Sequence, residues 1–296
     1  MSDGIARRDF LAAALSGSAL LGGGRQDVRD GAKQRLHNNK GIRINMLPKN
    51  LSAIDGLKAA VGAGFSQLEP FATLDDSRAL AIKNSAHAAG IRIGSVADQR
   101  NWKYPLTSAD PAVAKKGIEA QTAALENAHD WGADAILMIP GVVTPEVSYH
   151  DAWVRSRQQI ERLVPVAERL QVVMALEETC DQSKFLLSPR EYARYLDDFK
   201  SPYVRAYFDV GNVMPVGYPQ DWIHALGKRI VKVHLKDWNP KARQFVDLGD
   251  GVVDWPAVKQ AFIDVGYAGT FTAELRGGDP AYLRDLSRRI DRLLLD

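Results

Sequence analysis

Four short apolar runs in the second half of this 296-residue chain each lead into a side chain that can bind a metal ion or move a proton. These side chains are Glu177, Asp209, His234 and Glu274. Short apolar runs bounded by turn residues are typical of buried strands, and barrel enzymes carry their functional groups at the carboxyl ends of such strands. Three carboxylates and one imidazole suit a hard or borderline divalent ion, so the sequence predicts a metal site.

Alternation along the runs indicates that these side chains point to one place. In the run that ends at Asp209, this residue shares a face with Tyr207 and Arg205, while apolar residues occupy the other face. The runs that contain His234 and Glu274 follow the same pattern. In a barrel wrapped by helices the apolar face meets the helices, so the polar face points inward.

The run 172–178 ends in two adjacent carboxylates, Glu177 and Glu178, and either of them can point inward. An apolar residue, Leu176, stands directly before Glu177, as in the other three runs. This favours Glu177 as the ligand, with Glu178 as the alternative.

The elements that position these residues alternate regularly from residue 41 onward. The other expected strands are 42–47, 67–71, 91–96 and 135–139, and the expected helices include 111–131, 152–170, 189–199 and 255–265. Eight alternations of strand and helix predict a parallel sheet that closes into a barrel, so the fold class is α/β, a single-domain (β/α)8 TIM barrel. An open doubly wound sheet is the alternative, but the first predicted strand is not followed by the glycine motif of such sheets.

Composition is that of a globular protein, with 46% hydrophobic and 25% charged residues and a net charge of +2. Such a balance gives no electrostatic argument for binding nucleic acid or an anionic membrane. The single cysteine, Cys180, excludes an internal disulfide and is expected to be a structural thiol.

The first residues differ from the rest of the chain. Arg7 and Arg8 precede Asp-Phe-Leu, and residues 11–24 are small and apolar, a pattern that resembles a bacterial twin-arginine export signal. We therefore expect an export signal at 1–24, a polar linker at 25–40 and the barrel at 41–296. The expected location is periplasmic or otherwise extracytoplasmic, without stable membrane insertion after export.

Five segments in order resemble the xylose isomerase-like barrel superfamily, in particular the sugar phosphate isomerase/epimerase group that includes hydroxypyruvate isomerases and ketose 3-epimerases. They are ALE (175–177), FDVGN (208–212), VHLKD (233–237), LGDGVVDW (248–255) and AEL (273–275). The resemblance implies that Glu177, Asp209, His234 and Glu274 bind one divalent cation. Mn²⁺ is preferred on the donor set, with Mg²⁺, Co²⁺ or Zn²⁺ as alternatives. Asn212 departs from the Asp-x-x-His pattern of many of the epimerases.

The chemistry that fits is proton abstraction next to a carbonyl. Glu177 would remove the proton and Glu274 return it through an enediolate, which inverts the carbon. Return at the neighbouring carbon would be isomerisation, and a leaving group beta to the carbanion would permit elimination from a 3-keto-glycoside. Export favours a free sugar, keto-sugar or glycoside over a sugar phosphate, and Trp102, Lys236 and Arg276 are the expected substrate contacts.

Two other functions fit the sequence less well. A nuclease of the same barrel would need several zinc ions and more histidines at strand ends, where only His234 lies. The other histidines lie in expected helices, the linker or a loop; they are His37, His87, His129, His150 and His224. An exported sugar-binding barrel without turnover is the second alternative, and the complete set of four ligands argues against it. The oligomeric state stays open.

Overall fold

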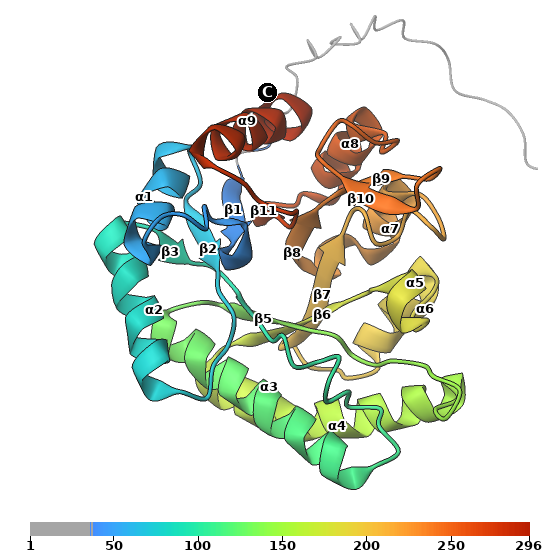
Figure 1. Cartoon of the computed structure of the whole chain (residues 1–296). Helices are drawn as coiled ribbons and strands as arrows, with labels where there is room; N and C mark the ends of the chain where they lie inside the picture. The colour runs from blue at the N-terminus through green and yellow to red at the C-terminus, as the bar shows by residue number, and fades with distance from the viewer. Residues whose placement is uncertain (1–35, 37) are drawn as a thin grey trace, which may run out of the picture. The chain divides into compact units, whose positions relative to one another are not determined.

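Parallel strands form the centre of the fold in the computed structural model, which describes residue 36 and residues 38–296. The strands of the main sheet follow one another in the order β3-β2-β1-β11-β8-β7-β6-β5-β4 (Figure 1). Their bounds are β1 Asn39–Arg43, β2 Gln67–Glu69, β3 Arg92–Ile93, β4 Val96–Ala97, β5 Ala135–Met138, β6 Val173–Glu177, β7 Val204–Asp209, β8 Ile230–Leu235 and β11 Thr270–Ala273. This nearly closed parallel sheet confirms the expected TIM barrel.

The barrel has nine strands rather than eight because the run expected as one strand, 91–96, is divided. Gly94 and Ser95 separate β3, which pairs with β2, from β4, which pairs with β5. The backbone at Gly94 passes close to another side chain, because a Cβ there would lie 1.9 Å from Gln67 Oε1. The two ends of the sheet are thus consecutive in the chain, which brings the strands round into a ring.

The first strand is shorter at its end than the expected span 42–47. β1 ends at Arg43, and a 3₁₀ turn covers Ile44–Met46. Met46 is fully buried against Gly277, where a Cβ would lie 2.3 Å from the Met46 Cα. The chain therefore leaves the sheet to pack under the loop that follows β11. β1 also begins at Asn39, within the last residues of the expected linker.

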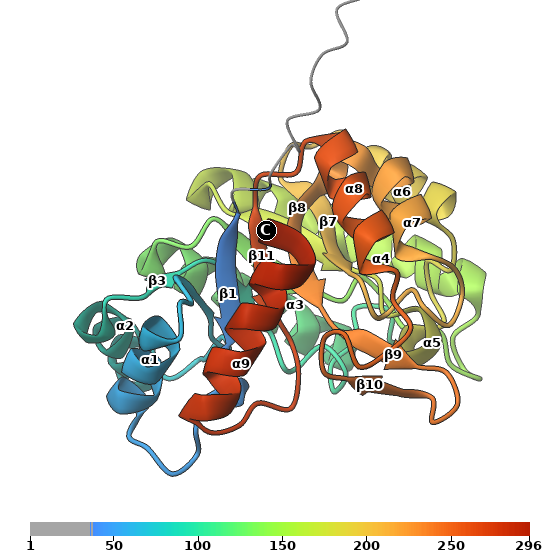
Figure 2. The same ribbon diagram turned by 90° about the horizontal axis from the view of Figure 1, so that it is seen from above.

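Helices cover the outside of the sheet (Figures 1 and 2). Their bounds are α1 Ala53–Gly62, α2 Asp76–Ala89, α3 Pro111–Trp131, α4 Tyr149–Leu170, α5 Cys180–Ser183, α6 Pro189–Asp197, α7 Pro219–Leu226, α8 Trp255–Val265 and α9 Pro280–Ile290. The expected bounds of α3 and α8 are confirmed, and Gly132 and Gly266 end them in the left-handed conformation that glycine favours. None of the helices described is both long and apolar enough to cross a membrane.

The strand register places two of the metal-ligand candidates at one level. Asp209 of β7 lies directly opposite His234 of β8, and Thr272 of β11 lies opposite the same histidine. Glu177 lies opposite Tyr207, two residues before Asp209, and Glu274 lies two residues beyond Thr272. A second, smaller sheet follows β8 directly and consists of β9 Asp237–Asn239 and β10 Gln244–Val246. Figure 2 shows this hairpin, in orange, beneath β8 at the carboxyl ends of the barrel strands.

Candidate metal centre

The structure brings the four strand-end residues together. One donor atom each from Glu177, Asp209, His234 and Glu274 lies within 4.8 Å of all the others. The imidazole is fully buried, and the carboxylates come from strands on both sides of it. Glu177 is on β6 and Glu274 directly follows β11, while β7 and β8 lie between them. The cluster can therefore hold one metal ion.

One ring nitrogen faces all three carboxylates. His234 Nδ1 lies 2.8 Å from Glu177 Oε1, 2.9 Å from Glu274 Oε2 and 3.8 Å from Asp209 Oδ2. A single nitrogen carries at most one proton, so it cannot donate to three acceptors at once. A cation shared by the nitrogen and the carboxylates satisfies all four groups, which is the physical reason this set suits a metal.

The turn after β7 leaves one oxygen of Asp209 free for such a cation. Asp209 Oδ1 accepts hydrogen bonds from the backbone N–H of Gly211 at 2.8 Å and of Asn212 at 3.0 Å. Its other oxygen, Oδ2, is buried and accepts no hydrogen bond, and the same is true of Glu274 Oε2. Buried polar atoms normally have partners, so these two oxygens fit the role of metal ligands.

Two cationic side chains contact the same carboxylates. Lys236 Nζ lies 2.9 Å from Asp209 Oδ2 and 2.8 Å from Glu274 Oε2, as an ion pair without hydrogen-bond geometry. Arg43 forms an ion pair with the other oxygen of Glu274. Four carboxylates lie within reach of His234 and carry four negative charges. Lys236 and Arg43 supply two positive charges. With a neutral imidazole a charge of −2 remains, which one divalent ion balances.

The fourth of those carboxylates, Glu69 of β2, was not among the residues expected from the sequence. Its Oε1 lies 3.0 Å from His234 Nε2, on the side of the ring opposite the cluster. Its Oε2 accepts hydrogen bonds from Tyr207 at 2.6 Å and from Ser95 at 2.7 Å. When Nε2–H donates to Glu69, the lone pair of Nδ1 faces the cluster. Carboxylates commonly orient metal-binding histidines in this way.

The surrounding charges set the protonation of Glu69 and His234. Burial alone raises the pKa of Glu69, but His234, Arg43 and Tyr207 together outweigh it and lower the pKa to about 2. Burial lowers the pKa of His234, and the neighbouring charges of Glu69 and Glu177 reverse the direction and raise it, which favours the protonated ring, so a metal ion that binds Nδ1 must displace its proton. Glu69 is therefore ionised at neutral pH and able to accept a hydrogen bond from the Nε2–H of the ring.

Replacing Glu69 by glutamine is expected to weaken Mn²⁺ binding by about 10- to 100-fold, because the ring loses its charged acceptor and its fixed orientation. Calorimetric titration of metal-free protein measures the affinity, and ¹⁵N NMR of the imidazole reports which nitrogen carries the proton. The Tyr207→Phe variant is the control, since it removes one hydrogen bond to Glu69 but keeps the contact with His234. Unchanged affinity and unchanged ring ¹⁵N shifts in Glu69→Gln would contradict the positioning role.

Glu178, the alternative to Glu177, turns away from the cluster. Its Oε1 accepts the backbone N–H of Asp209 at 2.9 Å, and it is not among the four grouped donors. Burial, followed by the charges of Asp209 and Glu177, raises the pKa of Glu178 well above its ordinary value. Glu178 therefore supports the strand that carries Asp209, and Glu177 takes the inward position.

A cavity of about 550 Å³ opens above the cluster. Its walls include Glu177, Glu274 and Lys236, together with Trp102, which is 45% exposed at the rim. Two of the expected substrate contacts thus line the cavity. The third, Arg276, lies in an adjoining cavity, with its guanidinium 3.2 Å from Asp247.

The remaining histidines lie away from the centre in the part of the chain described. His87, His129 and His224 are on helices, as expected, and His150 is the second residue of α4. His37 is outside the described residues. Cys180 is buried, and burial raises its thiol pKa, which accords with a structural thiol.

Comparison with known proteins adds a family context. The family model described as xylose isomerase-like TIM barrel matches residues 57–293. The chain is 28% identical over 247 residues to the L-ribulose-5-phosphate 3-epimerase UlaE of Salmonella paratyphi A, covering 79% of this chain and 86% of that protein. A solved L-ribulose 3-epimerase matches with a TM-score of 0.73 and 19% identity, over 86% of this chain and 94% of the other. The IOLI protein with a bound zinc atom matches with a TM-score of 0.72 and 15% identity, over 86% and 98%.

Proposed function

Because the chain belongs to the xylose isomerase-like TIM barrel family, we propose that it is a divalent-metal-dependent sugar epimerase or isomerase. Relatives named as sugar epimerases support an enzyme that acts on a carbohydrate. The observation that carries the proposal is the convergence of three carboxylates on one nitrogen of His234. The proposed reaction is removal of a proton from the carbon next to a substrate carbonyl.

Glu177, Asp209, His234 and Glu274 would hold the ion, and Mn²⁺ is the proposed metal. When bound, a divalent ion polarises a carbonyl and stabilises the negative charge of an enediolate. The protein supplies the orientation of the ligands: the turn after β7 fixes Asp209, and Glu69 fixes the histidine ring. The IOLI protein, which has the same fold, is named as binding a zinc atom, and this accords with a metal-binding barrel.

Glu177 and Glu274 are proposed as the proton-transfer pair. They stand on opposite sides of the centre, separated in the sheet by β7 and β8. A sugar placed between them presents opposite faces of its reacting carbon to the two carboxylates. Removal by Glu177 and return by Glu274 then invert that carbon, which is epimerisation. Return of the proton to the neighbouring carbon gives isomerisation.

The substrate is proposed to be a free sugar, a keto-sugar or a glycoside. The Lys236 ammonium is positioned to donate hydrogen bonds to substrate oxygens beside the two carboxylates that it contacts. The indole of Trp102 offers an exposed aromatic face at the rim against which a sugar ring can pack. These contacts support a polyhydroxylated ligand in the metal-site cavity.

The test is incubation of Mn²⁺-loaded protein in D₂O with free ketoses, namely D-fructose, D-tagatose, D-psicose and L-ribulose. NMR is expected to reveal a new epimer or isomer, with deuterium on the carbon next to the carbonyl. A shielded carboxylate can return the same proton, so product formation is scored separately from labelling. Metal-replete protein that gives neither product nor label with any of these sugars would count against the function.

Export is a separate part of the proposal and concerns residues outside those described. Arg7 and Arg8 followed by the apolar segment 11–24 support the twin-arginine route, which carries folded proteins. Replacing both arginines by lysine is expected to retain the protein in the cytoplasm. Fractionation of cells that produce each form measures this, and extracytoplasmic delivery of the lysine variant at the normal level would refute the route.

A further inference from the structure

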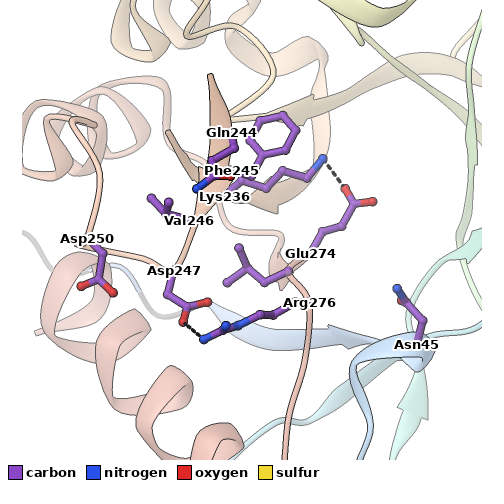
Figure 3. Close-up of a pocket in the computed structure, with 10 residues that line it drawn as sticks. Asn45, Lys236, Gln244, Phe245, Val246, Asp247, Asp250, Glu274 and Arg276 are labelled. Atoms are coloured by element: carbon purple, nitrogen blue, oxygen red, sulfur yellow. Dashed lines mark hydrogen bonds and ion pairs between the residues drawn. The ribbon is translucent and has the colours of Figure 1, made fainter. Parts of the chain in front are cut away.

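A second cavity of about 520 Å³ adjoins the metal-site cavity (Figure 3). The two share Asn45, Lys236 and Glu274 as walls, so the proposed metal centre lies where they meet. We propose that this second cavity is a subsite for an uncharged glycosyl group, which makes the substrate a glycoside whose reacting sugar occupies the metal-site cavity. This inference rests on the proposed function and narrows its substrate class.

The combined size of the two cavities supports a ligand of two sugar units rather than one. Pockets of about 300–1,000 Å³ accommodate ligands of drug size, and each of these two cavities falls in that range. Figure 3 shows Lys236 and Glu274 pointing toward each other, with Arg276 and Asp247 farther along the second cavity. A ligand longer than one ring can therefore pass the metal centre and extend toward Arg276.

The hairpin that forms one wall is held firmly by Asp237. This carboxylate is fully buried, and its oxygens accept backbone N–H bonds from Trp238, Gly249 and Val253 at 2.8–3.1 Å. It also accepts the indole N–H of Trp255 at 2.9 Å. A wall with so many fixed backbone groups is preformed, and preformed sites lose less entropy when a ligand binds.

Charge argues for a neutral ligand, since every charged side chain lining this cavity already has an opposite partner. Asp247 pairs with Arg276 and accepts a hydrogen bond from Tyr282 at 2.7 Å. Asp250 pairs with Arg289 at 2.7 Å. The two remaining charged residues, Lys236 and Glu274, pair with each other at 2.8 Å. A phosphate dianion would have to compete with these carboxylates for Arg276 and Lys236 and would be repelled by Asp247 and Asp250, whereas sugar hydroxyls can bond to paired groups.

The uncharged part of the lining also suits a sugar. Gln244 is exposed on β10 and offers both a donor and an acceptor for hydroxyl groups. The ring of Phe245 is held by Lys236, whose Nζ lies 4.7 Å from its centroid, and by Trp238 at 5.4 Å. A fixed aromatic ring beside a few polar groups is a common composition of small-molecule sites.

The experiment compares ketoses that share one fructose unit and differ in its substituent: D-fructose, D-fructose 6-phosphate, and the disaccharides isomaltulose and maltulose, which carry glucose on O6 and O4. Affinity is measured by calorimetry on Mn²⁺-loaded protein. At least one disaccharide is expected to bind about tenfold more tightly than fructose, the effect of one or two additional net hydrogen bonds. If neither disaccharide binds more tightly than fructose, or if both bind more weakly than D-fructose 6-phosphate, the assignment of the second cavity as a glycosyl subsite is wrong.

Two glutamine variants locate the effect. Gln244→Ala, in the second cavity, is expected to remove the advantage of the disaccharide and leave fructose affinity unchanged. Gln182→Ala, which lines only the metal-site cavity, is expected to weaken both ligands by the same factor. Equal loss for both ligands in Gln244→Ala would contradict the assignment. Deuterium exchange into fructose, followed in the same samples, tests the proposed function separately, because affinity does not depend on turnover.

Discussion

Glu177→Gln and Glu274→Gln are each expected to lower kcat by about 10²- to 10⁴-fold, the usual contribution of a general acid or base. Glutamine keeps the size of the side chain but cannot accept the substrate proton. The two residues flank the buried imidazole from β6 and from the end of β11, so neither can take over the role of the other. Steady-state rates on the best ketose, measured at saturating Mn²⁺, give the effect.

Glu178→Gln is the matched control, because it makes the same chemical change one residue away. Its amide oxygen can still accept the Asp209 N–H, and burial raises the pKa of Glu178, which favours the neutral form that glutamine resembles. Activity is expected to stay near that of the native protein. Metal content is measured in all three variants, since lost activity can reflect a lost ion. Full activity in metal-replete Glu177→Gln and Glu274→Gln would remove the proton-transfer role.

Asp209→Asn is expected to weaken Mn²⁺ binding by more than about 100-fold, beyond the 10- to 100-fold typical of residues outside the first coordination sphere. The amide oxygen of asparagine can keep the hydrogen bonds from Gly211 and Asn212. The amide nitrogen then stands where Oδ2 faces His234, and its N–H groups repel a cation. Turnover should disappear together with the metal. Calorimetric titration of chelator-treated protein measures the affinity.

Asp98→Asn provides the comparison for this ligand. Asp98 is buried and lines the same metal-site cavity, but it pairs with Arg100 at 2.8 Å and is not one of the four grouped donors. The Asp98→Asn substitution is expected to leave the affinity for Mn²⁺ nearly unchanged. If the two asparagine variants weakened Mn²⁺ binding equally, the effect would come from the general charge of the cavity, and Asp209 would not be a ligand.

The four candidate ligands could be predicted because the information is local. Alternation assigns the inward face of each run, and the carboxyl ends of parallel strands meet at one end of a barrel. The same rule identifies the polar face of β2, where Gln67 and Glu69 alternate with Leu68. That Glu69 contacts His234 could not be deduced, because β2 and β8 are separated in the sheet by β1 and β11.

Other features depend on contacts between distant segments. The division of the third strand follows from the close approach of Gln67 to Gly94, and the early end of β1 follows from the packing of Met46 against Gly277. The strands β9 and β10 are three residues each, too short for a periodic pattern to reveal. The wall of the proposed subsite and the pairing of Arg276 with Asp247 therefore could not be predicted from the sequence.

The most direct test of the metal centre is a crystal structure of Mn²⁺-loaded protein with anomalous diffraction measured near the manganese edge. A single anomalous peak is predicted, with one oxygen each of Glu177, Asp209 and Glu274 and the Nδ1 of His234 within about 2.0–2.6 Å of it. The Nε2 of that ring should keep its contact with Glu69. A peak elsewhere, or two or more of the four side chains turned away from the ion, would contradict the account.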